Sequence, residues 1–450
     1  MFVRNKRELL AHGNRKGRRI ALDIIEHALR AVDPYSAVKR LVKITNDVLS
    51  VGNLKIDLSQ VGNIYAVGAG KATLPVAHAL QEILGERLTK GVIIVKHGQK
   101  ATLNRIQVIE GGHPIPDTSG LRGARKILKL VKTGERGDLL FSLMTGGCSA
   151  LMPLPIEGVT LPDKRRVTEL LLRSGANIQE INAVRKHISA VKGGRLARHF
   201  RGKMLVNLTV SDVIGDPLDY ITGPTVPDTS TFVDAISSLT RHGLWDRAPA
   251  SITRHLGRSD PQMESPKSFP GLKYRTFVLT NNIDACHAAE KRARELGLNA
   301  QILSTMMEGE SVDMGIVMSG IAKEISKYNN PVEKPCAVIT SGETTVTMRG
   351  KAGQGGPNQE FALGFATKLT GIENAALVAI GTDGTDGPTG IAGGIADDQT
   401  LQRAAEMGID LFQSLRNHSS SQALKRLRDA VITGHTGTNV MDLRVMIIGA

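Results

Sequence analysis

The stretch that decides the fold reads Ile64-Tyr-Ala-Val-Gly-Ala-Gly-Lys-Ala-Thr73. Its apolar start predicts a buried strand over residues 64–67, and the glycines predict a tight turn into a helix over 71–84. Glycines after a strand let backbone amides approach an anion, and the next helix N-terminus adds partial positive charge. The stretch therefore predicts an anion-binding turn, while a tight turn with a solvated lysine accounts for it equally well.

Two common nucleotide-binding signatures do not match this stretch. A Walker A loop needs glycine at position 65 and serine or threonine at 72, where the chain has Tyr65 and Ala72. A dinucleotide fingerprint needs a small residue two places after Lys71, and Thr73 fits that position poorly.

Short apolar runs alternate with helical patterns on both sides of this stretch. Two helices are expected before it, over residues 20–31 and 34–42. The alternation predicts a parallel, helix-covered sheet of the doubly wound, Rossmann-like type. After the stretch, strands are expected at 92–95, 106–109, 139–144 and 204–210, and helices at 118–132, 163–173 and 180–199.

A second α/β block follows residue 272. The segment between residues 226 and 272 has weak periodicity and several Ser-, Pro- and Arg-containing stretches, which favours a boundary there. In the second block, strands are expected at 277–279, 302–303, 337–340, 344–348, 376–380 and 444–448, and helices at 283–296 and 311–327. We therefore predict an α/β protein with a Rossmann-like N-terminal domain (1–255), a linker (256–272) and a smaller C-terminal domain with a mixed sheet (273–450).

The composition favours an enzyme that handles anionic substrates. The 450 residues carry a formal net charge of +14, and only 3% of them are aromatic. A nucleic-acid-binding protein would add stacking aromatics or a recognisable module, and neither is found. No apolar run approaches the ~18 residues that a membrane helix needs. Three widely spaced cysteines indicate reduced thiols. We expect a cytoplasmic protein with no nucleic-acid partner and no membrane partner.

A second glycine loop, Thr145-Gly-Gly-Cys-Ser149, follows the strand expected at 139–144. Gly146 and Gly147 could cradle a phosphate or carboxylate through their backbone N–H groups, with Ser149 as a hydroxyl donor. Cys148 has no partner base nearby in the sequence, so a packed side chain fits it better than a nucleophile.

Two pairs of carboxylates also follow expected strands. Asp212 and Asp216 lie in one turn, and carboxylates at a strand end suit Mg²⁺. Asp383 and Asp386 lie in a later turn, where they could bind a metal or act as a general base. Helix capping and Asp-Gly turn chemistry are the structural alternatives for both pairs. The remaining candidates are His113, Glu343, Asn358, and the cations Arg185, Lys186 and Lys192, for which a solvated surface is the default.

Taken together and in this order, these segments resemble the class II glycerate kinases, whose C-terminal part is called the MOFRL domain. The resemblance runs from about residue 17 to the C-terminus. The segments that carry it are Val-Gly-Ala-Gly-Lys-Ala (67–72), Gly-His-Pro-Ile-Pro-Asp (112–117), Thr-Gly-Gly-Cys-Ser-Ala-Leu (145–151), Asn-Ala-Val-Arg-Lys-His-Ile-Ser (182–189), Val-Ser-Asp-Val-Ile-Gly-Asp (210–216), Ser-Gly-Glu-Thr-Thr-Val (341–346), Gly-Thr-Asp-Gly-Thr-Asp-Gly-Pro-Thr (381–389) and Thr-Gly-Thr-Asn-Val-Met-Asp-Leu (436–443).

The resemblance implies Mg²⁺- and ATP-dependent phosphorylation of D-glycerate, commonly at the 2-hydroxyl. It also implies an active site in the cleft between a Rossmann-like domain and a smaller C-terminal domain. Lys71 matches a lysine regarded as important in the family. The family's second important cation is an arginine in a Gly-Gly-Arg-Asn-Gln-Glu motif, where this chain has Pro357. Another basic residue, such as Arg349 or Lys351, must then substitute, or catalysis and specificity differ.

These expectations assign roles to the candidate residues. Phosphoryl transfer requires positioning and charge stabilisation more than covalent chemistry. We expect Lys71, Asp386 and Asp212 to be catalytic, with Asp386 as the first candidate for the base. Substrate contacts are expected from Lys71, His113, Ser149, Arg185 and Asn358, nucleotide or phosphate contacts from Gly68, Gly70, Gly146, Gly147 and Glu343, and metal contacts from Asp212, Asp216 and Asp383.

Two other functions fit parts of the pattern. A nicotinamide-dependent hydroxypyruvate reductase would act on a three-carbon acid of similar size, but its dinucleotide signature is absent. A non-catalytic sugar-phosphate-binding module would keep the anion loops without turnover. For the kinase we expect D-glycerate and ATP as small-molecule partners and a monomer or homodimer.

Overall fold

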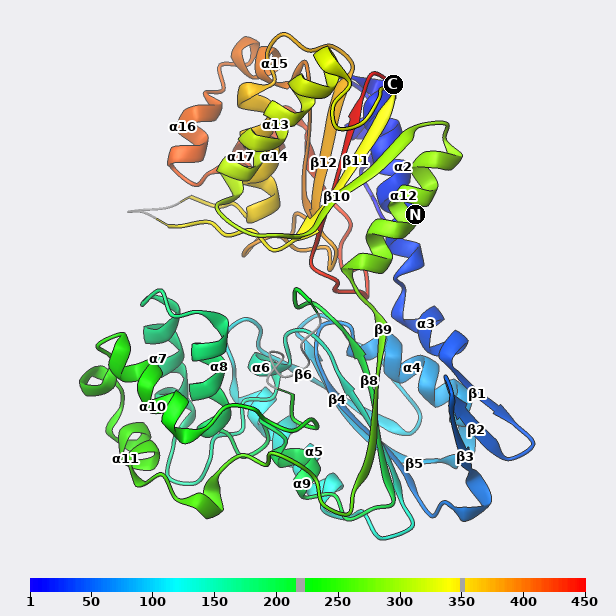
Figure 1. Cartoon of the computed structure of the whole chain (residues 1–450), viewed down its shortest axis with the longest axis vertical. Coiled ribbons are helices and arrows are strands. Elements are labelled where there is room, and N and C mark those ends of the chain that lie inside the picture. The colour runs from blue at the N-terminus through cyan, green and yellow to red at the C-terminus, as the bar shows by residue number, and fades with distance from the viewer. Residues whose placement is uncertain (216–222, 349–352) are drawn as a thin grey trace. The chain divides into compact units, whose positions relative to one another are not determined.

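The computed structural model describes residues 1–215, 223–348 and 353–450. It divides into two compact units (Figure 1). The central unit is Pro34–Leu279, and the terminal unit combines Met1–Asp33 with Thr280–Ala450. Among the described helices, none combines the length and the apolar run that spanning a bilayer requires.

The main sheet of the central unit confirms the predicted doubly wound architecture. Its strand order is β6-β5-β4-β7-β8-β9, and the pairs β6–β5, β5–β4, β4–β7 and β7–β8 are parallel. Strands β4 and β7 are buried along their whole length, as expected for a sheet covered on both faces. The bounds are β4 Ile64–Ala69, β5 Leu88–Lys96, β6 Ile106–Gly111, β7 Leu139–Met144, β8 Met204–Val210 and β9 Lys273–Thr280.

Helices cover both faces of this sheet. Helix α4 (Thr73–Leu84) packs on one face together with α3 (Pro34–Leu41). Helices α5 (Thr118–Val131), α6 (Cys148–Leu151) and α9 (Arg195–Arg198) contribute to the core on the other. A separate apolar cluster joins α7 (Leu161–Leu172), α8 (Ile178–His187), α10 (Phe232–Arg241) and α11 (Ala250–Arg258). A small antiparallel sheet, β1 (Val42–Thr45), β2 (Val48–Val51) and β3 (Leu54–Asp57), was not predicted.

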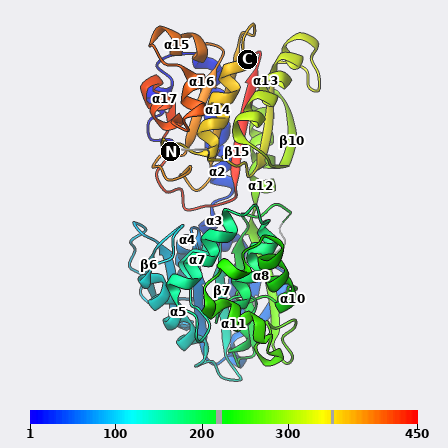
Figure 2. The ribbon, with the colours of Figure 1, turned by 90° about the vertical axis from the view of Figure 1, so that its left-hand side faces the viewer.

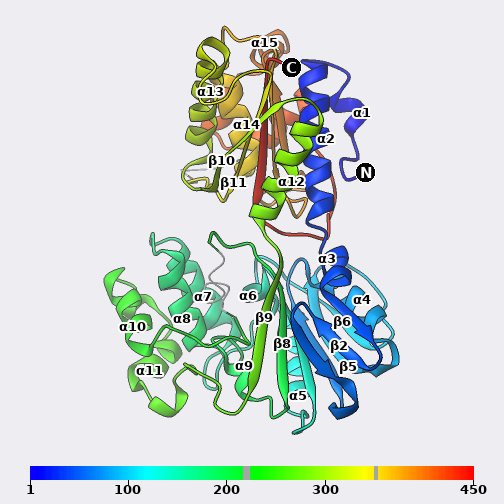
Figure 3. The same ribbon diagram turned by 45° about the vertical axis from the view of Figure 1, so that its right-hand side comes forward.

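The terminal unit contains the predicted mixed sheet, in the order β10-β11-β15-β12-β13-β14. Only its β10–β11 pair is parallel among the described strands. Helices α2 and α12 lie side by side on one face, and α13 and α14 cover the other (Figures 2 and 3). The strands are β10 Asn299–Met307, β11 Cys336–Gly342, β12 Ala375–Gly381, β13 Gly393–Asp397, β14 Ala430–Val431 and β15 Asp442–Ile448, and the helices are α1 Lys6–Leu9, α2 Arg15–Ala31, α12 Asn282–Glu295, α13 Ser311–Tyr328, α14 Pro357–Lys368, α15 Thr400–Glu406, α16 Leu411–Arg416 and α17 Ser420–Leu427.

The chain divides between the units at places that differ from the predicted bounds 1–255, 256–272 and 273–450. Residues Met1–Asp33 belong to the terminal unit, and β9 completes the central sheet instead of starting the second one. The prediction of a strand at 344–348 is wrong. Thr345 instead pairs with the turn before α13, donating its N–H to the Gly309 carbonyl and accepting from the Ser311 N–H.

Arg18 on α2 fixes the N-terminal segment to the terminal unit. Its side chain is fully buried and forms ion pairs with Asp397 and with Asp429, the latter at 2.7 Å. The planar guanidinium of Arg18 donates N–H groups to both carboxylates in fixed directions, so these pairs set the position of α2. They also neutralise the buried charge of Arg18. The apolar face of α2 packs against α12, β12 and β15.

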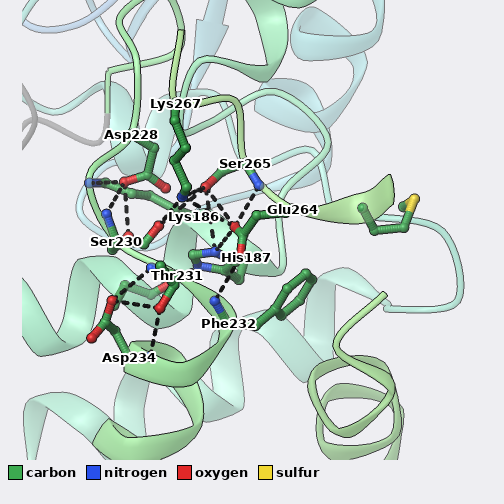
Figure 4. A network of polar contacts seen from close by, with 12 residues as sticks. Lys186, His187, Asp228, Ser230, Thr231, Phe232, Asp234, Glu264, Ser265 and Lys267 are labelled. Carbon is green, nitrogen blue, oxygen red and sulfur yellow. Dashed lines mark hydrogen bonds and ion pairs between the residues drawn. The ribbon is translucent and has the colours of Figure 1, made fainter. Parts of the chain in front are cut away.

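The predicted linker 256–272 instead anchors two helices of the central unit (Figure 4). The Glu264 carboxylate accepts hydrogen bonds from the Phe232 N–H at the start of α10, from the Ser265 N–H, and from the His187 ring at the end of α8 (3.0, 2.7 and 2.7 Å). Partial burial acts to raise the pKa of Glu264, but these donors outweigh it and lower the pKa to about 2.

Glu264→Gln should therefore destabilise the central unit by about 1–2 kcal/mol at pH 7, the typical value of hydrogen bonds to a charged group. Because the folded pKa of Glu264 lies below the unfolded value near 4.3, its contribution is complete above about pH 5 and disappears as the pH falls towards 2. Urea unfolding of the wild type and the variant at several pH values measures this difference. Glu135→Gln, an exposed position, is the matched control; a gap that does not narrow in acid would contradict the assignment.

Candidate active site

The carboxyl ends of the parallel strands bring the predicted loops of the central unit to one edge. Lys71 follows β4, His113 follows β6, the Gly146–Ser149 loop follows β7 and Asp212 follows β8. Ligands bind at this edge in open α/β sheets. The sheet thus collects candidates that are far apart in the sequence.

Thr145 ties the first two loops together. Its N–H donates to the Ala69 carbonyl (3.1 Å), and its hydroxyl accepts from the Ala72 N–H (3.2 Å). The Lys71 N–H donates to the Gly146 carbonyl (2.8 Å). These bonds fix the backbone of Lys71 relative to the second glycine loop.

Gly68 and Gly70 allow the close approach that these bonds require. A Cβ on Gly70, whose φ is +148°, would lie 2.0 Å from the Thr145 hydroxyl, and one on Gly68 would lie 2.6 Å from the Leu143 carbonyl. The Gly70 N–H already donates to the Ile94 carbonyl (3.2 Å). This geometry supports a role for Gly68 and Gly70 in the packing of β4 and its turn against Leu143 and Thr145. Phosphate binding by the two glycines stays a prediction.

Gly146 and Gly147 differ from the first pair, because their N–H groups have no acceptor among the described residues. Gly147 has a φ of +86° and begins the short helix α6. A Cβ there would lie 3.1 Å from His113 Nε2 and 3.2 Å from Lys71 Cγ, so both side chains flank the loop. Two donors beside a lysine and an imidazole form an arrangement suited to an anion.

The basic helix predicted at 180–199 is interrupted, and its cations face inward. Lys186 on α8 is buried and pairs with Asp228 at 2.8 Å (Figure 4). Lys192, in the turn between α8 and α9, donates to the Ser149 carbonyl at 2.7 Å. Burial lowers the pKa of Lys192 to about 7, and the charge of Arg185 adds to the effect. Neither lysine has the solvated position that is the default for such residues.

Two further residues of this region bear on the chemistry. Burial raises the pKa of Cys148 to about 11, which agrees with a packed thiol and not with a nucleophile. Lys164 on α7 is also buried and was not predicted as a site residue. Leu161, Lys164 and Leu171 share a face at helical spacing, so a lysine within an apolar stripe was the available signal.

The terminal unit brings together Asn358, Asp383 and Asp386. Asp386 holds the N-terminus of α14: one oxygen accepts from the Asn358 backbone and side chain (3.0 and 3.1 Å), and the other accepts from both groups of Gln359 (2.9 and 3.1 Å). Burial and the nearby Asp442 carboxylate raise the pKa of Asp386 to about 7. Asp383 accepts from the Thr385 N–H and hydroxyl, both at 2.9 Å.

Asp442 and Arg444 extend this cluster and were not predicted as site residues. Asp442 accepts from Asn358 Nδ2 (2.7 Å) and from Arg444 (2.8 Å), and the Arg444 guanidinium lies over the Phe361 ring. The charge of Glu343, which is itself exposed, also acts on Arg444. Two charged residues, Asp442 and Arg444, at alternate positions of a strand that continues as an apolar run were the available signal. Arg444 therefore provides a guanidinium beside Asn358, the residue that follows Pro357.

The predicted metal ligands are divided between the units, with Asp212 in the central unit and Asp383 in the terminal unit. Asp216, Arg349 and Lys351 lie outside the described residues. Within the described ranges, no three His, Cys, Asp or Glu side chains are arranged to hold a metal ion on their own. Mg²⁺ usually takes one or two carboxylates together with phosphate oxygens, so the donor types of Asp212 and Asp383 are suitable.

Comparisons with known proteins agree with the sequence motifs. Residues 20–257 match the family described as "Domain of unknown function (DUF4147)", and residues 336–442 match the MOFRL family. The chain is 41% identical to the glycerate 2-kinase of Pyrococcus horikoshii, over 96% of this chain and 97% of that one. A crystal structure of glycerate kinase from Thermotoga maritima is 38% identical and superposes with a TM-score of 0.80, covering 96% and 99% of the two chains. A protein of Agrobacterium vitis named "putative hydroxypyruvate reductase" is 38% identical over 86% of this chain and 88% of its own length.

Gly147→Ala tests the anion cradle. Its Cβ would contact His113 and Lys71, and the positive φ costs an L-residue about 1–2 kcal/mol. Gly158→Ala is the matched control, because Gly158 has a φ of +80° and no atom within 4 Å of its Cβ position. We expect similar losses of stability in thermal unfolding, but about 10-fold weaker pyrophosphate binding by calorimetry only for Gly147→Ala, the cost of one hydrogen bond to a charged group. Equal binding by the two variants would contradict the cradle.

Proposed function

The chain belongs to the glycerate kinase family, and we propose that it transfers a phosphoryl group from ATP to the 2-hydroxyl of D-glycerate, giving 2-phosphoglycerate and ADP. The observation that supports this most is the pair of acceptor-free amides of Gly146 and Gly147 next to Lys71 and His113. Such a cradle matches the anionic oxygens of both substrates.

In this proposal Lys71 stabilises negative charge on the transferring phosphoryl group or holds the glycerate carboxylate. Its backbone is fixed by the Gly146 carbonyl, so the side chain starts from a defined position beside the cradle. His113 and Ser149 lie at the same edge of the sheet, and we propose that they contact glycerate. The reaction depends on such positioning, because phosphoryl transfer needs little covalent help from the protein.

The proton of the attacking hydroxyl requires an acceptor, and Asp386 and Asp212 are the candidates. Both oxygens of Asp386 already accept two N–H donors each, and its side chain is buried. Asp212 is only partly buried and lies at the carboxyl edge of the central sheet. This difference favours Asp212 as the base and a structural role for Asp386 at the start of α14.

We further propose that Mg²⁺ accompanies ATP, with Asp212, Asp216 and Asp383 as the carboxylates that would hold it. When bound, the ion would neutralise charge on the phosphate oxygens. Asn358, Glu343 and Arg185 remain proposed contacts for substrate or nucleotide. A cytoplasmic location and a monomeric or homodimeric state also remain predictions.

The alternative is a hydroxypyruvate reductase, the name carried by the Agrobacterium vitis relative. Its nicotinamide cofactor would need a small residue at position 73. The Thr73 hydroxyl there donates to the Leu143 carbonyl at 3.0 Å and takes part in the packing between β4 and β7. Thr73 therefore has a packing role in this structure, and a dinucleotide-binding turn would have a smaller residue at its position. This difference favours the kinase.

Phosphorus NMR of the products decides between these functions. With Mg²⁺, ATP and D-glycerate, we expect the resonances of ADP and 2-phosphoglycerate. A 3-phosphoglycerate signal would contradict the regiochemistry. Oxidation of NADH or NADPH with hydroxypyruvate, in the absence of ATP turnover, would support the reductase. Failure of both reactions would support a non-catalytic binding module.

Lys71→Ala should lower kcat by about 10²–10³-fold, the usual cost of removing one charge-stabilising group from an active site. Thermal unfolding should remain unchanged, because the side chain is only partly buried. The matched control is Lys90→Ala, an exposed lysine near the amino end of β5, at the opposite edge of the sheet. A steady-state assay that finds near-normal kcat in Lys71→Ala would overturn the assignment.

A further inference from the structure

Several cationic side chains are buried together in the central unit. Lys164, Lys192 and Arg195 are 4%, 0% and 7% exposed, and Arg185 is half-buried. They come from three helices and a turn: α7 carries Lys164, α8 carries Arg185, the following turn carries Lys192, and α9 begins with Arg195. We refer to these four residues as the buried cation cluster.

The cluster has too few acceptors for its charge. Lys164 Nζ and Arg195 Nη1 have no hydrogen-bond partner among the described residues. Lys192 donates to the Ser149 carbonyl, and Arg195 Nη2 donates to the Met263 carbonyl at 2.5 Å, so both partners are uncharged.

The neighbouring carboxylates pair directly with other cations, although Asp228 Oδ2 has no hydrogen-bond partner among the described residues. Asp228 and Glu264 attract Arg195, but Asp228 pairs directly with Lys186 and Glu264 with His187 (Figure 4). Lys186 is thus a buried lysine with a direct carboxylate partner on the same helix as Arg185. Lys186 therefore has a carboxylate partner, whereas Lys164, which is equally buried, has none among the described residues.

The charges also repel one another. Burial lowers the pKa of Lys164 well below its usual value, and the positive charges of Lys192, Arg185 and Arg195 lower it further. Burial lowers the pKa of Arg195 to about 10. Burying a cation without a partner costs several kcal/mol, and repulsion between neighbouring cations adds to this cost. A bound anion would supply the missing negative charge and remove both costs.

The cluster adjoins the glycine cradle. Lys192 Nζ contacts the carbonyl of Ser149, two residues after Gly147. The charges of Lys192 and Asp212 both act on Cys148, which places them around the same loop. Lys192 therefore connects the buried cation cluster to the loop whose Gly146 and Gly147 amides have no acceptor among the described residues.

We propose that Lys164, Arg185, Lys192 and Arg195 form a buried anion-binding site that receives a carboxylate or phosphoryl group of the substrates; the identity of those substrates rests on the proposed function. Lys164 and Arg195 supply N–H donors that lack partners, and Lys192 links the site to the Ser149 loop. The ligand neutralises the cluster when it binds.

Lys164→Met in the full chain tests this site, because methionine keeps the volume and removes the charge. In the ligand-free protein we expect Tm to stay the same or to rise by about 2–4 °C, since a buried amine without a hydrogen-bond partner among the described residues is replaced by an apolar side chain. By calorimetry without metal, we expect the Kd of at least one of D-glycerate, 2-phosphoglycerate and pyrophosphate to rise at least 10-fold. Lys164→Arg should retain most of the affinity.

The pattern of losses identifies the source of the anion. Weaker binding of D-glycerate with unchanged pyrophosphate binding assigns the site to the carboxylate, and the reverse assigns it to phosphoryl oxygens. Arg166→Gln, an exposed cation on the same helix, should change neither Tm nor any Kd, and glycerol should give no signal with any variant. Pyrophosphate binding is also informative if the wild type catalyses neither glycerate phosphorylation nor hydroxypyruvate reduction. If the wild type then binds pyrophosphate and Lys164→Met does not, the proposed function is wrong and the anion-binding site is supported.

Unchanged Kd values for all three anions in Lys164→Met would overturn the site. So would a fall in Tm of more than about 4 °C, because it would show that Lys164 stabilises the ligand-free fold. If Lys164→Met does not fold at all, the proposed site is likewise overturned. Any loss of pyrophosphate binding in Lys192→Met would then be attributed to the Ser149 loop alone.

Discussion

The close approach of the Lys71 turn to the Thr145 loop is the constraint on which the central candidate site depends. Gly70 leaves room for the Thr145 hydroxyl, and the Lys71 N–H donates to the Gly146 carbonyl. A hydroxyl and two carbonyls thus satisfy the backbone of the first loop, whereas the amides of Gly146 and Gly147 have no acceptor among the described residues. This difference in hydrogen bonding is the reason that we propose the second loop as the anion-binding one.

The buried cations of the protein differ in whether they have a carboxylate partner, and Lys186 of the central unit has one in Asp228. In the terminal unit Arg18 and Arg444 each have a carboxylate partner, so their charges are balanced inside the protein. In the central unit Lys164 and Lys192 have no carboxylate partner among the described residues. A buried charge without a partner destabilises a fold, and buried groups with strongly shifted pKa values are candidates for a functional site.

Much of the central sheet could be predicted because most of its strands contain an uninterrupted apolar run. The expected bounds of β7 and β8 match the structure, and those of β4 and β5 fall inside the observed strands. Helical periodicity predicts a helix over residues 20–31, but it carries no information on which part of the fold the helix packs against, so residues 1–33 were assigned to the N-terminal domain and not to the terminal unit. Candidate loops were found from glycines and aspartates, which mark turns. Lys164 and Arg444 were missed for different reasons: Lys164 stands in a charged run of α7 that resembles a solvated surface, and Arg444 stands in a strand whose burial the sequence pattern does not relate to any partner.

The pairing of Arg18 with Asp429 has a consequence for synthesis of the protein. The two residues are 411 positions apart, and β15, which lies between β11 and β12, is made after both. At roughly 5–20 residues per second, about 20–80 s pass between the synthesis of Arg18 and that of Asp429, and the part of α2 that packs against β15 stays uncovered at least that long. The central unit is one continuous segment, so its contacts can form during that interval. The sheet of the terminal unit is complete only once β15 has been made.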